Sequence, residues 1–274
     1  MKNLSYIIVE RPASFGSFEK FAAALHRVKD LGYHGVEFNL TQPAGFELEA
    51  LARLAESIKL PIVSFLTGAN YFDQGLCLSS PRPEVRLRAT EQLRQYTQIA
   101  ARFGAVLVVG QMQGFLSDEP DQALGEARIE ECMKRVVEAA ERHRTTIAFE
   151  PVNHLQAGFN NNLKAVMALA ARIGSSYFKP MLDTFHMNVE EKSMTEPIYR
   201  VGRDLAHFHL CESNGSLLGS GHLDFDSILQ ALDASRYPGY VSLKIYRQPW
   251  AAGAEASIEF LRGTSEKQFS EVPL

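Results

Sequence analysis

The sequence predicts a single-domain α/β protein with the (β/α)8 fold of a TIM barrel. Eight short apolar runs alternate with longer amphipathic segments along the 274 residues, and this number of units fits a barrel of ~250 residues. The apolar runs show little alternation with polar residues, which is typical of parallel strands covered by helices. No low-complexity segment or linker divides the chain, so we expect one domain.

The predicted strands are short runs rich in β-branched and aromatic residues. They are 5–10 (SYIIVE), 35–40 (GVEFNL), 61–66 (PIVSFL), 105–110 (AVLVVG), 146–150 (TIAFE), 179–183 (KPMLD), 206–210 (AHFHL) and 239–244 (GYVSLK). A longer segment follows each of them, so each strand is expected to lead into a helix.

The predicted helices carry apolar residues at helical spacing. Segment 17–32 opens with Ser17 as a candidate N-cap and ends at Gly32, the residue types that favour helix starts and ends. Segments 82–104 and 121–143 show the same periodicity. Asp224 is expected to cap the helix that follows it. We expect residues 1–263 to form the barrel and residues 264–274 to form a C-terminal tail.

A doubly wound open sheet is the alternative fold for this alternation of strands and helices. It would need a glycine-rich phosphate turn after the first strand. The segment there reads VERPASFGS and lacks the GxGxxG pattern, so the barrel is favoured.

Composition and charge exclude several classes of function. The net charge is −4 and no block of Lys or Arg stands out, so no nucleic-acid partner is expected. The first fifteen residues lack the apolar run of a signal peptide, and no segment is long and apolar enough to span a membrane. The three cysteines, Cys77, Cys132 and Cys211, have no CxxC spacing, which indicates reduced thiols and a cytoplasmic protein.

Polar residues on five of the predicted strands mark the expected site, because catalytic residues of such barrels lie at the carboxyl ends of the strands. They are Glu37 in the second strand, Glu150 at the end of the fifth, Asp183 at the end of the sixth, His207 and His209 in the seventh, and Lys244 at the end of the eighth. Glu150, Asp183 and His209 are expected to converge at one mouth. Two carboxylates and an imidazole suit Mn²⁺, Mg²⁺, Co²⁺ or Zn²⁺. A single such residue would be an ordinary polar strand end, but three on successive strands favour a metal site.

Several segments resemble the xylose isomerase-like TIM barrels, and in particular their ketose 3-epimerase group, which acts on D-tagatose and D-psicose. The matching segments are FEPVNH, LDTFHMNVEE, HFHLCESN, GYHGVEF and GSGHLDFDSILQAL with YPGYVS. The resemblance implies a divalent metal held by two Glu, one Asp and one His, with the two Glu exchanging a proton at C3 of a ketose. Glu150, Asp183 and His209 match three of the ligands, and His186 matches a substrate-contacting histidine. The resemblance also implies a homo-oligomer.

Three positions depart from the pattern of that group. Lys244 stands where the group has its fourth ligand, a Glu. Gln156 replaces a substrate-contacting Glu, and Gly215 replaces a substrate-contacting Arg. We take Gln156 and His186 as candidate substrate contacts. Glu37 is a further candidate for substrate contact, with an orienting role or a buried ion pair as the alternatives.

The lysine changes the charge of the site. Two carboxylates and a protonated Lys244 carry the same formal charge as three carboxylates with a divalent ion. A bound ion would repel the ammonium, so either the metal binds weakly or not at all, or Lys244 loses its proton and acts as the second base.

Three functions therefore stay open. The first is a sugar isomerase or epimerase of the isomerase class, acting on a ketose or related polyol. Glu150 and Lys244 would move protons through an enediolate, assisted by Mn²⁺, Mg²⁺ or Co²⁺. The second is a metal-independent lyase, dehydratase or aldolase-type enzyme using Lys244. The third is a sugar-binding barrel without catalysis. A DNA-repair endonuclease on a related fold needs a multi-zinc cluster with more histidines and a basic surface, and is disfavoured.

Overall fold

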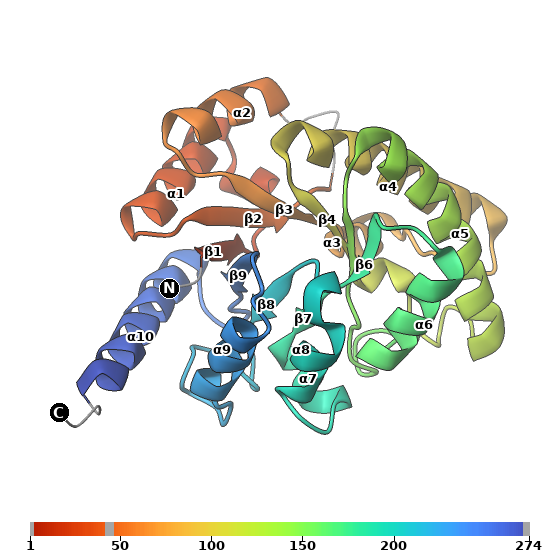
Figure 1. Ribbon diagram of the computed structural model, residues 1–274. Helices are drawn as coiled ribbons and strands as arrows, with labels where there is room; N and C mark the ends of the chain where they lie inside the picture. Colours follow the sequence, from red (N-terminus) through yellow and green to blue (C-terminus); the bar gives the residue numbers. More distant parts are fainter. Residues whose placement is uncertain (1–2, 42–46, 271–274) are drawn as a thin grey trace.

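The computed structural model is a barrel of parallel strands surrounded by helices (Figure 1). The structure describes residues 3–41 and 47–270. The strands are β1 (Asn3–Ile8), β2 (Gly35–Asn39), β3 (Ile62–Leu66), β4 (Val106–Val109), β5 (Ile147–Phe149), β6 (Phe178–Pro180), β7 (Leu182–Asp183), β8 (Phe208–Leu210) and β9 (Tyr240–Leu243). Each predicted strand overlaps an observed one, and the predicted TIM-barrel fold is confirmed.

The nine strands form one sheet in the order β6-β5-β4-β3-β2-β1-β9-β8-β7. Its two ends, β6 and β7, follow each other directly along the chain and correspond to the single predicted strand 179–183. Before Met181 the segment pairs with β5, and after it with β8. The backbone N–H of Met181 still bonds Phe149, while that of Leu182 bonds His207. The sheet therefore closes through this segment as an eight-position barrel.

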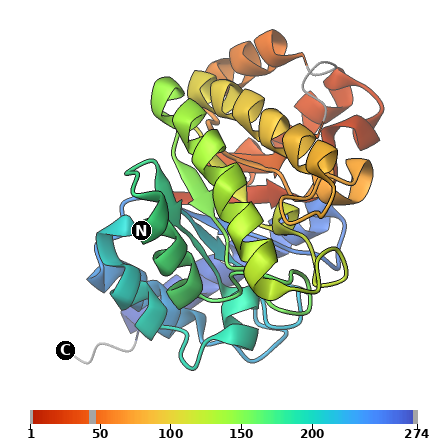
Figure 2. The same cartoon turned by 90° about the vertical axis from the view of Figure 1, so that its right-hand side faces the viewer.

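The helices cover the outside of the sheet. They are α1 (Phe18–Asp30), α2 (Leu48–Ser57), α3 (Ala69–Gln74), α4 (Pro83–Phe103), α5 (Gln122–His143), α6 (Leu163–Ile173), α7 (Thr184–Glu190), α8 (Glu196–Val201), α9 (Phe225–Ala234) and α10 (Trp250–Ser270), with 3-10 turns η1 (Pro12–Phe15), η3 (Gln111–Gln113) and η4 (Gly202–Asp204). The two long helices α4 and α5 pack side by side (Figure 2). Among the described residues, no helix combines the length and apolarity needed to cross a bilayer.

The predicted tail boundary lies inside a helix. The helix α10 begins at Trp250 and continues past residue 263 to Ser270, and residues 271–274 lie outside the described part of the chain. The division into a barrel of residues 1–263 and a tail of residues 264–274 stays a prediction.

Apolar packing occupies two places. The large core fills the space between the strands and the surrounding helices. A second, small cluster of Ile7, Leu66, Val108, Ala148 and Met181 comes from alternate strand positions and fills part of the barrel interior. The other interior positions, on β1, β2, β3, β8 and β9, carry buried polar side chains. The barrel interior therefore has an apolar part and a polar part, and β1 and β3 contribute side chains to both.

Candidate active site at the carboxyl end of the barrel

A cavity of about 370 Å³ opens at the carboxyl ends of the strands. This size is within the range of pockets that hold small molecules. Its polar lining includes Arg11, Gln111, Glu150, Gln156, His186 and Lys244, and aromatic rings from Phe72, Phe115 and Tyr246 lie beside them. These residues come from segments that follow different strands, as is usual for barrel enzymes.

Lys244 lies at the centre of the charged groups in this cavity. It is the first residue after β9, so its side chain continues the inward-facing row of Ser242. Its Nζ donates a hydrogen bond to Asp183 Oδ2 at 2.9 Å and lies 3.6 Å from Glu150 Oε1. The residue is only 8% exposed. The ammonium is thus held between two buried carboxylates.

His209 completes the group from β8. Its Nδ1 lies 3.4 Å from Asp183 Oδ2 and 3.5 Å from Glu150 Oε1, distances too long for good hydrogen bonds. Accordingly, His209 Nδ1 and Glu150 Oε1 are buried and have no hydrogen-bond partner among the described residues. The ring is held from its other side, because Nε2 lies 3.2 Å from Glu37 Oε2.

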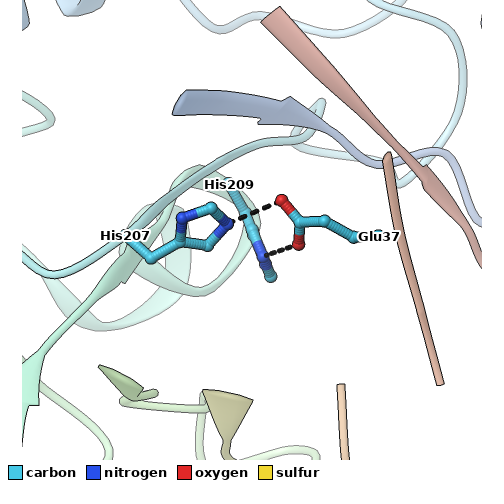
Figure 3. Close-up of side chains that lie close together, drawn as sticks. All are labelled: Glu37, His207 and His209. Carbon is cyan, nitrogen blue, oxygen red and sulfur yellow. Dashed lines mark hydrogen bonds and ion pairs between the residues drawn. The ribbon is translucent and has the colours of Figure 1, made fainter. Parts of the chain in front are cut away.

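Glu37 is buried in the polar part of the barrel interior, where its carboxylate points toward His207 and His209 (Figure 3). Its carboxylate contacts His207 Nε2 at 2.7 Å and accepts a hydrogen bond from Ser64 Oγ at 2.5 Å. The hydroxyls of Ser5 and Ser242 also donate to it. Glu37 does not line the cavity, and the geometry favours the orienting role over contact with a substrate. A carboxylate behind a histidine in this way fixes its ring orientation and makes it a better ligand.

Charge pairing, not burial, decides the protonation of the acidic groups. Burial acts to raise the pKa of Glu150, but Lys244 and the two nearby histidines outweigh it and lower the pKa to about 2. At Asp183, burial again acts to raise the pKa, but the charge of Lys244 outweighs burial and holds the pKa well below its usual range. The pKa of Glu37 also lies well below its ordinary value, because its contacts with His207 and His209 outweigh burial. All three carboxylates are therefore ionised at neutral pH.

The pKa values of Lys244 and His209 are raised. Burial lowers the pKa of Lys244, but Asp183 and Glu150 raise it well above its ordinary value. Burial likewise works against His209, whose contacts with Asp183, Glu150 and Glu37 raise its pKa to about 10. Lys244 is a protonated donor in this arrangement, whereas Glu150 is an acceptor. Such a pair can move protons to and from a bound molecule.

His186 and Gln156 reach the cavity from loops. The Nε2 of His186 lies 3.7 Å from Glu150 Oε1 and 4.0 Å from Asp183 Oδ2. Burial lowers the pKa of His186. Gln156 lines the cavity, and its backbone carbonyl accepts a hydrogen bond from Gln111 Nε2 at 2.5 Å. Gly215 does not line it. A side chain there would meet the ring of Tyr246, and the backbone φ of +69° favours glycine.

Three of these groups fit a divalent metal ion. Glu150 Oε1, Asp183 Oδ2 and His209 Nδ1 approach one another closely, and Glu150 Oε1 and His209 Nδ1 have no hydrogen-bond partner among the described residues. Two carboxylates with one imidazole are donors that divalent ions take. Glu150, Asp183 and His186 form a second possible set, because their ligand atoms all lie within 4.8 Å of one another. Lys244 cannot act as a ligand while it holds its proton, so the residues present supply three donors and one opposing charge.

Some residues of the site carry no recognisable signal in the sequence. Arg11 and Gln111 line the cavity, but Arg11 lies in a loop and Gln111 in the 3-10 turn η3, and neither belongs to a motif. Ser5, Ser64 and Ser242 surround Glu37 from β1, β3 and β9. The sequence shows only that each could face the barrel interior, because side chains alternate between the two faces of a strand. Asn153, which contacts His186, belongs to the quoted FEPVNH segment, yet nothing in that segment distinguishes it.

The fold and the site together define a TIM barrel with a carboxylate–ammonium pair and a group of candidate metal ligands at the mouth of the barrel. The family model described as "Xylose isomerase-like TIM barrel" matches residues 25–264. The chain belongs to this family, as the sequence predicts.

Individual relatives agree with the predicted isomerase class. A ketose 3-epimerase of Arthrobacter globiformis is 27% identical over 220 residues, which are 80% of this chain and 75% of that protein. An L-ribulose 3-epimerase of Mesorhizobium japonicum is 25% identical over 225 residues, 81% of this chain and 74% of that protein. The solved structure of an L-ribulose 3-epimerase superposes with a TM-score of 0.83 at 21% identity and covers 99% of both chains.

Proposed function

We propose that the protein is a sugar isomerase or epimerase that moves a proton at the carbon beside the carbonyl of a ketose or related polyol. The observation that carries this proposal is the pairing of an ionised Glu150 with a protonated Lys244, 3.6 Å apart, beside the cavity. The sugar epimerases among the relatives support the same reaction class.

The proposed roles follow from the charges of the side chains. Glu150, which is ionised, accepts the proton from the substrate carbon. Loss of that proton leaves an enediolate, whose negative oxygen needs a positive neighbour in a buried site. Lys244 provides that charge and returns a proton. His186 and Gln156 contact the sugar oxygens.

Glu150, Asp183 and His209 would hold a divalent ion, for which we propose Mn²⁺, Mg²⁺ or Co²⁺. When bound, the ion would polarise the carbonyl and stabilise negative charge on oxygen. The ammonium of Lys244 opposes this binding, so we expect it to be weak.

The substrate is expected to lack a phosphate group. Among the described residues that line the cavity, Arg11 and Lys244 carry the positive charges. The guanidinium of Arg11 is already bound by both carboxylate oxygens of Asp73, and Lys244 is bound by Asp183. A phosphate would therefore find no free cationic partner in this lining.

A metal-independent lyase, dehydratase or aldolase-type reaction is the second candidate. It is favoured by the direct hydrogen bond of 2.9 Å from Lys244 to Asp183, which gives the carboxylates a cation without a metal. A Schiff base would need a neutral amine, and the raised pKa of Lys244 disfavours it. An ammonium that polarises a carbonyl is the form of this candidate that agrees with the charges.

Turnover of a panel of ketopentoses and ketohexoses tests the two candidates. We expect chromatography to reveal an epimer or isomer of at least one sugar, with loss of activity in chelator and recovery on addition of Mn²⁺. Activity that survives the chelator unchanged would favour the metal-independent enzyme. A borohydride-trapped adduct on Lys244 would show that the metal-independent reaction uses an imine and not a polarising ammonium. Binding of sugars without any turnover would contradict both.

We further propose a cytoplasmic homo-oligomer. The three cysteines are free and buried, which suits a reducing compartment, and the family resemblance favours self-association. Light scattering on the purified protein measures the number of subunits.

A further inference from the structure

Asn153 lies outside the cavity but contacts a side chain that lines it. It follows β5 in the loop that also carries Gln156, and it is 1% exposed. Its Nδ2 lies 2.9 Å from His186 Nδ1, and its backbone N lies 3.4 Å from the same ring nitrogen. Two nitrogens of one residue thus approach a single nitrogen of the histidine.

The orientation of the Asn153 amide follows from its other contact. The backbone N–H of Leu155 donates to Asn153 Oδ1 at 3.1 Å. A backbone N–H can only donate, so this end of the amide must be its oxygen. The end that faces His186 is therefore the NH₂ group, which can only donate.

The proton on the His186 ring is then placed as well. Nδ1 receives donors from both the side chain and the backbone of Asn153, so it must act as an acceptor and carry no proton. The ring proton belongs to Nε2, since a neutral imidazole protonates one nitrogen only. That nitrogen points toward Glu150 and Asp183 at the cavity.

We propose that Asn153 is a positioning residue that sets the tautomer of His186, so that its Nε2–H is offered to an oxygen of the bound sugar. This inference rests on the proposed function, because it takes a sugar to be the occupant of the cavity. The opposite tautomer would face two carboxylates with a lone pair and would leave the NH₂ group of Asn153 opposed to an N–H. Asn153 therefore prevents the ring from presenting an acceptor to the substrate.

The Asn153 side chain also supports the loop by accepting from Leu155 N, so a control variant is needed to separate the two roles. The turn that positions Gln156 uses the backbone carbonyl of Asn153, which accepts from Gln156 N at 2.9 Å and Ala157 N at 3.0 Å. A matched control is Asn161→Ala. The side chain of Asn161 donates to Val152 O and Ala157 O, both at 2.8 Å, and supports the same loop.

Two variants test the proposal by two readouts. Nitrogen NMR of the full chain, labelled at histidine and kept in Mg²⁺, reports which ring nitrogen is protonated; the His186 signal is identified by its loss in His186→Gln. We expect an unprotonated Nδ1 in the unaltered protein and a protonated Nδ1 in Asn153→Asp, whose carboxylate demands a donor. In Asn153→Leu, kcat/KM should fall about tenfold, as for loss of one directed hydrogen bond.

The outcomes are distinguishable from a failure of the proposed function. A protonated Nδ1 in the unaltered protein overturns the inference, and so does an Asn153→Leu variant that loses no more kcat/KM than Asn161→Ala. If the unaltered protein turns over no ketose, the proposed function fails, while the NMR spectrum still decides the tautomer. Sugar affinity in Asn153→Leu, measured by calorimetry, then replaces kcat/KM as the second readout.

Discussion

At the scale of single residues, Lys244 distinguishes this site from one made only of metal ligands. Its ammonium lies among Glu150, Asp183 and His209, the groups that fit an ion. Two unit charges at about 4 Å interact by about 4 kcal/mol at an intermediate dielectric constant. A divalent ion would therefore lose much of its binding energy to this one side chain.

Substitution of Lys244 by Glu should raise the affinity for Mn²⁺ by about two orders of magnitude or more, because it removes an opposing charge and adds a fourth donor, the third carboxylate. Calorimetric titration of dialysed protein measures the change. Lys244→Met removes the charge without adding a donor. Its Mn²⁺ affinity should therefore lie between those of the unaltered protein and Lys244→Glu. Equal Mn²⁺ affinities in the unaltered protein and in Lys244→Glu would show that the ammonium does not oppose the metal.

The sequence predicts residues at strand ends well and residues behind them poorly. Glu150, Asp183, His209 and Lys244 could be placed at one mouth because parallel strands end on the same side of a barrel. The depth of Glu37 could not be predicted, because its strand position alone allows contact with either the cavity or the interior. Its three serine neighbours and His207 place it below the site. The tautomer of His186 depends on a loop contact that no sequence pattern encodes.

At the scale of elements, helix starts follow the capping rules. Asp224 precedes α9 and accepts hydrogen bonds from Ser227 N at 3.1 Å and from Ser227 Oγ at 2.5 Å. Ser17 accepts from Lys20 N at the start of α1. Both caps were expected from residue type. The interruption between β6 and β7 was not expected, because nothing in the run KPMLD marks the point at which pairing changes from β5 to β8.

Replacement of Asp224 by Ala should lower the free energy of unfolding by about 1 kcal/mol near neutral pH. The hydrogen bonds from Ser227 lower the pKa of Asp224, so the ionised cap stabilises the fold above the ordinary aspartate pKa and loses this contribution as the pH falls through the lowered value. Urea unfolding at about pH 7 and about pH 3 measures both effects.

The destabilisation by Asp224→Ala should therefore shrink in acid. Asp224→Asn is the control, because its amide oxygen can still cap the helix at either pH. An Ala variant that loses as much stability in acid as at neutral pH would contradict the assignment of an ionised cap.

At the scale of the whole molecule, the barrel interior has an apolar part and a polar part. The cluster around Val108 and Met181 is apolar and includes side chains from β1, β3, β4 and β5. The polar part holds the Glu37 network, in which Glu37 contacts His209 Nε2 (Figure 3). The eight-unit alternation in the sequence was enough to predict the barrel. The sequence could not show which polar residues would meet in the interior, because that depends on strand register.

The central claim is that Glu150 and Lys244 exchange protons with a sugar carbon, and solvent isotope incorporation tests it most directly. Turnover in heavy water, followed by NMR, should place deuterium on the carbon beside the carbonyl at a rate at least equal to product formation. In Glu150→Gln this exchange should fall by about a hundredfold or more. Product formed without deuterium from the solvent, or exchange in Glu150→Gln at the unaltered rate, would contradict the account.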